Sequence, residues 1–350
     1  VHVANGIYEN CPNDEAHELF KLPEFVNKMM ENKWLGSKTG QGFYKKEGKD
    51  ILTLDLDTLE YRANKKASFA TLELTKTIEK PIDRFKVLVT GKDKAGDFYR
   101  KNFASMFQYC SNRIPEITDA FYKIDDAMKA GFGWENGPFE IWDAIGIEKG
   151  IELMKAEGYQ PASWVTDMVA SGNTSFYSIK DGATHFYSIT NKKVEKVPGQ
   201  DAFIILNNIR ESKKIWNNSD SIITDLGDGI INLEFTSKMN SIGAGVLQGI
   251  NKAIDIAEKD YNGLVIGNQG ANFSVGANLG MIFMMAVEQE YDELNMAIKM
   301  FQDTMMRCRY SAIPVIAAPH GMTLGGGCEL TMHADRAVAA AETYIGLVEF

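Results

Sequence analysis

Several features that would mark common protein classes are scarce or absent in this sequence. Cysteines and histidines are few: four cysteines contain no CxxC pair, and five histidines show no metal-ligand spacing. The sequence therefore predicts neither a disulfide framework nor a metal site, and reduced thiols favour a cytoplasmic location. The cysteines are Cys11, Cys110, Cys308 and Cys328.

Positive charge is also scarce, because 37 Lys and Arg face 47 Asp and Glu, a formal net charge of −10. No basic stripe is present to neutralise phosphates, so nucleic acid is excluded as a partner. No apolar run approaches the length of a membrane-spanning helix. A hydrophobic content of 45% with 24% charged residues is typical of ordinary globular protein.

With 350 residues, the chain is long enough for two or more domains. It begins at Val1 without a methionine, inside a helical pattern, and stops one residue after Glu349. We therefore expect it to be a fragment of a larger protein. We also expect this fragment to be inactive by itself.

The first part of the chain is predominantly helical in pattern. Residues 1–46 are predicted to be helical and to end in the glycine-punctuated loop 34–44. Residues 47–95 are interpreted as a linker with one strand, 85–90. Residues 96–158 are predicted to form a second helical unit, in which apolar residues recur at helical spacing. Its aromatic residues are expected to form a core and not a cofactor site. Residues 159–220 are predicted to be a linking region with a β-hairpin at Asp181-Gly182.

Residues 221–350 alternate strands with helices, which predicts an α/β unit. A hairpin is predicted at Asp228-Gly229. Two later helices are predicted to have apolar faces, the first formed by Val246, Leu247, Ile250 and Ile254, and the second by Leu294, Ile298, Phe301, Met305 and Cys308.

Within this α/β unit, the loops 273–278 and 324–329 each follow a predicted strand and lead into a helix. In such sheets, ligands bind outside the carboxyl ends of the strands. Each loop offers a backbone N–H beside a glycine, from Ala277 and from Gly326, and two carboxylates follow, Glu329 and Glu349. Two N–H groups on one carbonyl oxygen and two carboxylates are the groups that acid/base chemistry on a thioester needs.

These residues are also compatible with other interpretations. Either loop alone is better explained as an ordinary turn in which glycine allows tight packing. The glycines after residue 266 and after residue 130 do not follow G-x-G-x-x-G, so no dinucleotide fingerprint is predicted. Cys328 lies at a close-packed helix start and is expected to fill space there. Val275 and Met281 are candidates for contact with a CoA or acyl group, although methionine at such positions is more often core.

The residues 273–280 and 321–335 closely resemble the crotonase (enoyl-CoA hydratase/isomerase) superfamily. The resemblance implies that Ala277 and Gly326 form an oxyanion hole, that Glu329 deprotonates water and that Glu349 exchanges the proton at the α-carbon. Asn278 stands where an acidic residue is usual, and Gly346-Leu-Val-Glu349 stands where hydratases commonly have G-x-P-E. The presence of both glutamates favours a hydratase over an isomerase.

The segments 38–44 and 131–143 resemble the C-terminal helical region of 3-hydroxyacyl-CoA dehydrogenases. The order of the two parts is similar to a bacterial type of bifunctional β-oxidation enzyme. The implied fold is an all-α dehydrogenase-like region, with units at 1–46 and 96–158, followed by a truncated crotonase-like ββα spiral domain from 221 to 350.

The same resemblance implies hydration of trans-2-enoyl-CoA here and NAD-dependent dehydrogenation by the full-length protein. No cofactor is expected on this chain, because the NAD domain would precede Val1. The expected partners are acyl-CoA and, in assembly, a second copy or a thiolase. The alternatives are an isomerase or thioester hydrolase on the same fold, and a non-catalytic acyl-CoA-binding fragment.

Overall fold

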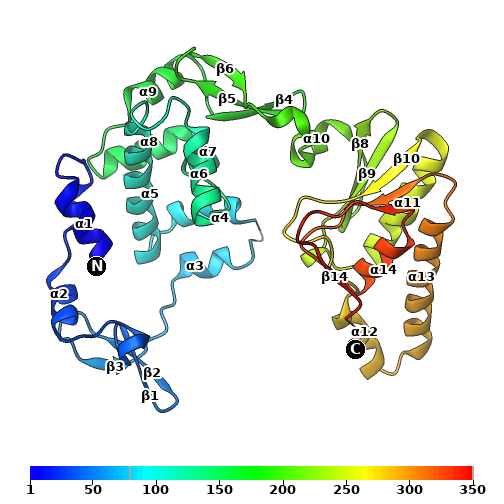
Figure 1. Cartoon of the computed structure of the whole chain (residues 1–350), viewed down its shortest axis with the longest axis horizontal. Helices are drawn as coiled ribbons and strands as arrows, with labels where there is room; N and C mark the ends of the chain where they lie inside the picture. The colour runs from blue at the N-terminus through cyan, green and yellow to red at the C-terminus, as the bar shows by residue number, and fades with distance from the viewer. Residues whose placement is uncertain (79, 349–350) are drawn as a thin grey trace. The chain divides into compact units, whose positions relative to one another are not determined.

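The computed structural model describes residues 1–78 and 80–348 of the chain. These form two compact units: an N-terminal unit of residues 1–178 and 185–195, and a C-terminal unit of residues 179–184 with those from 196 onward. Most of their elements are labelled in Figure 1. Within the described residues, no helix is both long enough and apolar enough to cross a membrane.

The N-terminal unit begins with short helices and a small sheet. Its first elements are α1 (His2–Asn10), α2 (Glu24–Glu31) and the antiparallel strands β1 (Tyr44–Glu47), β2 (Asp50–Leu54) and β3 (Tyr61–Ala63). Single 3-10 turns lie at His17–Phe20 and Ser37–Thr39. The segment interpreted as a linker from residue 47 therefore contains two strands of a sheet and, further on, two helices.

The remainder of the N-terminal unit is helical. Its helices are α3 (Ala70–Thr75), α4 (Pro81–Thr90), α5 (Lys94–Asn112), α6 (Tyr122–Phe132), α7 (Pro138–Ile145), α8 (Ile147–Ala156) and α9 (Ser163–Ala170). The strand predicted at residues 85–90 is wrong, because these residues form the end of α4. Pro81 starts that helix at its first position, and Leu88 and Val89 bury their side chains at helical spacing. The helical spacing in residues 96–112 is confirmed by α5.

An aromatic core fills the helical part. Phe107 stacks on Trp142 with ring centroids 4.7 Å apart, and both side chains are fully buried. Phe121, Phe139 and Phe176 contact one another edge to face or tilted, with centroids 5.1–5.3 Å apart. Aromatic pairs in these geometries stabilise a core beyond the area they bury. The predicted role of aromatic residues as core is confirmed here.

Two carboxylates that are shielded from water lie at the two ends of α7, Asp125 fully buried and Asp143 partly buried. Asp125 of α6 accepts hydrogen bonds from the N–H groups of Phe139 and Glu140 (2.9 and 3.1 Å) and from the Tyr177 hydroxyl (2.7 Å). Asp143 accepts from the N–H groups of Phe176 and Tyr177 (2.7 and 2.8 Å). Burial raises the pKa of each carboxyl group to about 7, although these hydrogen bonds favour the ionised form.

The predicted hairpin at Asp181-Gly182 is confirmed, with both residues in the left-handed region (φ 52° and 75°). The boundary between the two units falls within this hairpin. Its sheet has the order β4-β5-β6, from strands β4 (Tyr177–Lys180), β5 (Ala183–Ser188) and β6 (Lys193–Lys196). The 3-10 turn Gln200–Ala202 and helix α10 (Leu206–Lys213) follow.

The C-terminal unit is built on a six-stranded sheet of order β13-β11-β10-β9-β8-β7. Its strands are β7 (Lys214–Asn217), β8 (Ser221–Gly227), β9 (Ile230–Phe235), β10 (Gly263–Ile266), β11 (Val315–Ala317) and β13 (Arg336–Ala337). Within this sheet, β9, β10, β11 and β13 pair in parallel, and β7, β8 and β9 pair antiparallel. The predicted Asp228-Gly229 hairpin joins β8 to β9.

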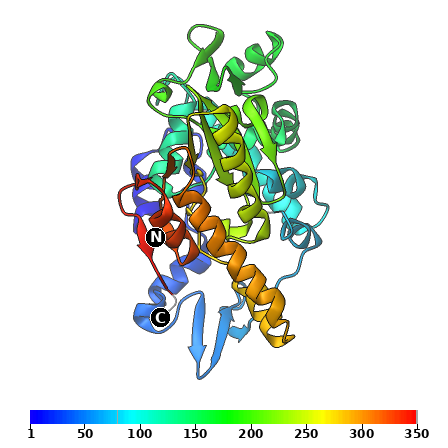
Figure 2. The same ribbon diagram turned by 90° about the vertical axis from the view of Figure 1, so that its right-hand side faces the viewer.

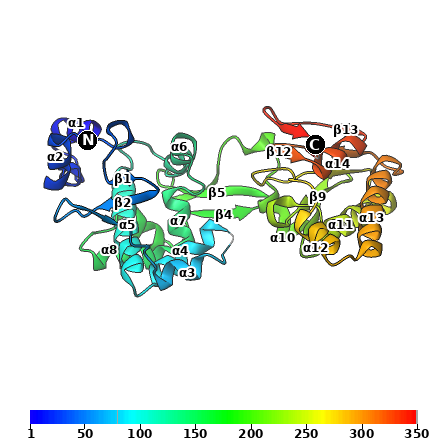
Figure 3. The ribbon, with the colours of Figure 1, turned by 90° about the horizontal axis from the view of Figure 1, so that it is seen from below.

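Helices cover this sheet. Helix α11 (Ala244–Asp260) packs on β8, β9 and β10, and α13 (Tyr291–Arg309) lies beside α11, as Figure 2 shows. The predicted inward face of α11 is confirmed by the burial of Val246, Leu247, Ile250 and Ile254. Helix α12 (Leu279–Val287) precedes α13 and buries none of its side chains. The short strands β12 (Met322–Leu324) and β14 (Tyr344–Gly346) pair in parallel next to helix α14 (Gly326–His333) (Figure 3).

Candidate active site

The first loop follows β10 and is held by its own side chains and by the chain before β12. Asn268 Nδ2 donates to the carbonyl oxygen of Phe273 (3.1 Å), and the Phe273 N–H donates to the carbonyl of His320 (3.0 Å). Ser274 pairs with Thr323 of β12 through a parallel bridge. The loop then turns at Gly276, whose φ of +91° is a conformation that strains other residues.

The second loop leads from β12 into α14. Gly325 (φ +49°) donates its N–H to the carbonyl of Gly346 (2.9 Å), and Gly326 is the first residue of the helix. The first N–H groups of a helix have no partner within it and are available to a ligand. A Cβ on Gly327 would lie 2.9 Å from Cβ of Ser274, so glycine is needed for the loops to meet.

The N–H groups of Ala277 and Gly326 lie close together where the loops meet. A Cβ built on Gly276 would lie 3.1 Å from the Gly326 nitrogen, and one built on Gly326 would lie 3.5 Å from the Ala277 nitrogen. Neither N–H donates a hydrogen bond to any residue that the structure describes. The sequence predicted this pair, and the structure brings the two residues together; their role as donors to a ligand stays a prediction.

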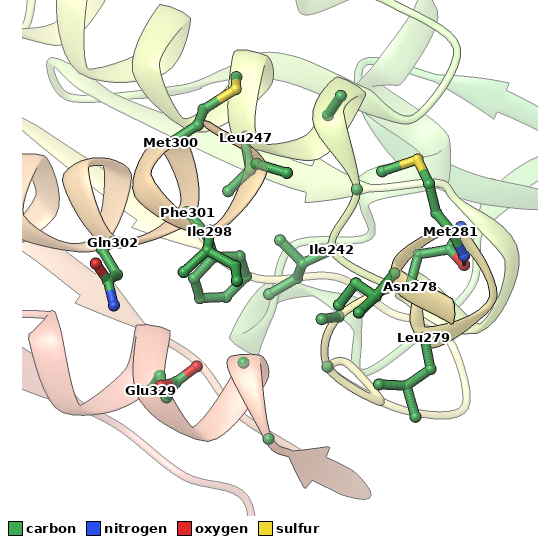
Figure 4. Close-up of a pocket in the computed structure, with 18 of the residues that line it drawn as sticks. Ile242, Leu247, Asn278, Leu279, Met281, Ile298, Met300, Phe301, Gln302 and Glu329 are labelled. Atoms are coloured by element: carbon green, nitrogen blue, oxygen red, sulfur yellow. Dashed lines mark hydrogen bonds between the residues drawn. The ribbon is translucent and has the colours of Figure 1, made fainter. Parts of the chain in front are cut away.

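Both residues line a pocket of about 620 Å³. Figure 4 shows Ile242, Leu247, Ile298 and Phe301 around it, with Glu329 on α14 at one side. Most of the lining is glycine or apolar, and its polar side chains belong to Asn278, Gln302 and Glu329. Sites for small organic ligands have this size and this predominance of apolar side chains.

Glu329 supplies the carboxylate of the pocket. It lies on the first turn of α14, where its N–H bonds the Gly325 carbonyl (3.0 Å), and its side chain is partly buried. Among the described residues, no hydrogen bond or ion pair occupies its carboxylate. It is therefore available to a water molecule or a ligand in the pocket. Its predicted partner Glu349 lies outside the described residues, and Val348 before it lines the pocket.

The remaining predicted residues are also placed by the structure. Val275 and Met281 line the same pocket. Asn278 caps α12, because its Oδ1 accepts a hydrogen bond from the Met281 N–H (3.3 Å). Cys328 is buried within α14. No group of three or more histidine, cysteine or acidic side chains in the described part of the chain is arranged to hold a metal ion.

Many of the other pocket residues were not singled out from the sequence as site residues, and Ile242, Phe301 and Gln302 are among them. Ile242 comes from the segment before α11, and Phe301 and Gln302 come from α13. Phe301 was predicted only as part of an apolar helix face. The same face includes Ile298 in the pocket and Met305 and Cys308 in the core. A single apolar stripe thus serves both the core and the pocket, and its spacing does not distinguish them.

Two family models match the chain. Residues 94–182 match the C-terminal domain of 3-hydroxyacyl-CoA dehydrogenase, and residues 226–350 match enoyl-CoA hydratase/isomerase. The chain thus carries a helical 3-hydroxyacyl-CoA dehydrogenase C-terminal region followed by a crotonase-fold region, which confirms the predicted recognition and fold class.

The chain is also similar to individual proteins over nearly all of its length. The chain is 44% identical over its full length to a probable 3-hydroxyacyl-CoA dehydrogenase of Bacillus subtilis (strain 168), covering 44% of that protein. It is 26% identical, over 96% of its length and 43% of the relative's, to a putative fatty acid oxidation complex trifunctional enzyme of Rickettsia felis. The chain therefore spans less than half the length of these relatives.

A solved enoyl-CoA hydratase/isomerase from Xanthobacter autotrophicus Py2 is 25% identical, with a TM-score of 0.33. The match covers 38% of this chain and 49% of that one.

Proposed function

We propose that the crotonase-fold region hydrates trans-2-enoyl-CoA to 3-hydroxyacyl-CoA in fatty-acid β-oxidation. The observation that supports this most is the meeting of two N–H groups with the Glu329 carboxylate in one apolar pocket. These N–H groups, from Ala277 and Gly326, have no hydrogen-bond partner in the part of the chain that the structure describes. Such donors stabilise the negative charge that develops on a thioester oxygen when a nucleophile adds to the conjugated double bond.

The proposed reaction divides the work among these groups. The thioester oxygen accepts hydrogen bonds from Ala277 and Gly326. Glu329 takes a proton from water as its oxygen bonds to the β-carbon, and the electron pair of the double bond moves to form the enolate. Glu349 gives a proton to the α-carbon, so that H and OH are added across the double bond. This role of Glu349 rests on the family resemblance of its position.

For the protein that contains this chain, we propose a second activity, NAD-dependent oxidation of the 3-hydroxyacyl-CoA product. Its support is the match of residues 94–182 to the dehydrogenase C-terminal domain and the similarity to the Bacillus subtilis protein. We propose that NAD is bound by residues outside this chain. The two activities would act in sequence, since the product of hydration carries the hydroxyl group that a dehydrogenase oxidises.

Variants Glu329→Gln and Glu349→Gln test the hydration proposal in the natural protein that contains this chain. Each keeps the side-chain volume but removes the proton-transferring carboxylate, so hydration should fall by about 10²–10⁴-fold. Oxidation of 3-hydroxyacyl-CoA, measured in parallel, should be unchanged and controls for folding.

Unchanged hydration in both variants would sink the assignment. Conversion of 3-enoyl-CoA to 2-enoyl-CoA without hydration would instead identify an isomerase. Release of free CoA thiol would identify a hydrolase. Binding without any turnover would indicate a non-catalytic acyl-CoA-binding function.

A further inference from the structure

We propose that Ser274 is a positioning residue whose hydroxyl group fixes the direction of the Ala277 N–H toward the pocket. The inference rests on the proposed function, because it concerns one of the two proposed oxyanion donors. Ser274 itself does not line the pocket and is fully buried. It would therefore act through the backbone and not on the substrate.

The hydroxyl group of Ser274 joins two backbone segments. Its Oγ donates to the carbonyl oxygen of Asn240 (2.7 Å) and accepts from the N–H of Gly276 (3.1 Å). Asn240 is 34 residues away in sequence, so this hydroxyl is a tertiary link between the first loop and the segment before α11. Removal of the hydroxyl would leave the buried N–H of Gly276 and the partly buried carbonyl of Asn240 without this partner.

The peptide group between Gly276 and Ala277 is held on its carbonyl side. The Gly276 carbonyl accepts a hydrogen bond from the Ile242 N–H (2.8 Å). A trans peptide group is planar, so its N–H points opposite to its C=O. Anchoring this carbonyl on Ile242 therefore directs the Ala277 N–H away from that segment. With Ser274 holding the preceding N–H, both peptide groups that flank Gly276 are fixed.

The segment that provides Ile242 depends on the same hydroxyl. Met239 and Asn240 both adopt left-handed backbone conformations (φ 55° and 54°), which non-glycine residues rarely adopt. The Asn240 carbonyl is bonded by Ser274, and its side-chain Nδ2 donates to the Asn272 carbonyl (2.9 Å). Such strain persists only when surrounding contacts hold it. Ser274 thus supports the Gly276–Ala277 peptide both directly and through Asn240.

The backbone of Ser274 connects the first donor to the second. Its N–H donates to the Met322 carbonyl (3.2 Å), and its carbonyl accepts from the Leu324 N–H (2.9 Å). Leu324 is two residues before Gly326, which carries the other proposed donor. The spacing of the two donors is therefore set through Ser274, whose hydroxyl then orients one of them.

Variants Ser274→Ala and Ser274→Cys test the inference in the natural protein, with Thr323→Val as a matched control. Thr323 pairs with Ser274 and is fully buried, but its hydroxyl has no hydrogen-bond partner among the described residues. Two readouts are needed: kcat and KM for hydration, and the infrared frequency of the thioester carbonyl of a bound, unreactive saturated acyl-CoA. The frequency reports directly on the donors.

For Ser274→Ala we expect kcat to fall about ten- to a hundredfold with little change in KM, since a misdirected donor is costly mainly in the transition state. The carbonyl frequency should move toward its value in solution. Ser274→Cys replaces the hydroxyl by a weak S–H donor of similar size, so its kcat and its carbonyl frequency should lie between those of the wild type and Ser274→Ala. Thr323→Val should match the wild type in both readouts.

An unshifted carbonyl frequency in both Ser274 variants would overturn the inference, whatever the fall in kcat. If the wild-type protein does not hydrate enoyl-CoA, the proposed function alone is contradicted, because the frequency comparison does not depend on turnover.

Discussion

The ring of Phe301 lies against the backbone of Gly326, where a Cβ atom would stand 2.5 Å from the ring's Cζ. Helix α13 thus limits the residue at the proposed oxyanion position to glycine. The effects of substitutions at positions 326 and 301 on activity should therefore not be additive.

Substitution Gly326→Ala should lower kcat/KM for hydration by about 10²-fold, because the displaced ring or backbone misplaces one donor. The double variant Gly326→Ala/Phe301→Leu should recover part of this loss, since the smaller side chain leaves room for the methyl group. Gly131→Ala serves as the control, because nothing lies within 4 Å of that Cβ position. Additive losses in the double variant would show that the ring does not set the constraint.

The apolar side of the pocket predicts a preference for longer acyl chains. Ile298 lines the pocket yet remains 45% exposed, so Ile298→Asp should fold normally. It should reduce kcat/KM for a ten-carbon enoyl-CoA at least tenfold and leave the four-carbon substrate within about twofold, since each buried CH₂ contributes about 0.8 kcal/mol. Met296→Asp is the matched control on the same helix, because Met296 is exposed and does not line this pocket. Equal losses on both substrates would contradict the prediction.

The partly buried carboxyl group of Asp143 predicts a pH dependence of stability in the N-terminal unit. Its pKa of about 7 lies above the unfolded value of about 4, so the folded state binds more protons between these values. The free energy of unfolding should therefore fall as pH rises from 4.5 to 7, and Asp143→Asn should show a shallower fall. Urea denaturation at several pH values, followed by tryptophan fluorescence, measures this slope.

Asp119→Asn is the control for Asp143→Asn. Asp119 is exposed, and its hydrogen bond with Lys123 lowers its pKa, so its titration lies below this pH range. Its substitution should leave the slope unchanged. Asp143→Asn should also lower stability by about 1–3 kcal/mol, because an amide has one oxygen where the carboxylate accepts two N–H groups. An unchanged slope in Asp143→Asn would show that Asp143 is ionised throughout.

The features that the sequence predicted correctly are those set by local spacing. The hairpins at Asp181 and Asp228 and the apolar faces of α5 and α11 follow from turn chemistry and periodicity over a few residues. A strand was predicted at residues 85–90 because their β-branched and aromatic side chains favour one. The burial of Leu88 and Val89 stabilises a helix there instead.

The glycines of the candidate site were predictable from the sequence, but the tertiary contacts that hold its loops in place were not. Gly326 and Glu329 stand in a recognisable segment, whereas the partner of Ser274 is Asn240, which no local pattern connects to it. The Phe301 contact with Gly326 likewise joins residues 25 positions apart. Such contacts depend on the fold, so a single sequence does not reveal them.

The capping of α7 has a consequence for how the N-terminal unit folds. Gly137 stands at the N-cap position without a side chain. In its place, the carboxylate of Asp125, which lies on α6, accepts hydrogen bonds from the N–H groups of Phe139 and Glu140 in the first turn of α7. The start of α7 is therefore completed only when α6 has docked. Helix formation here is tied to tertiary assembly, and we expect hydrogen exchange at Phe139 and Glu140 to report opening of the α6–α7 pair as one cooperative unit.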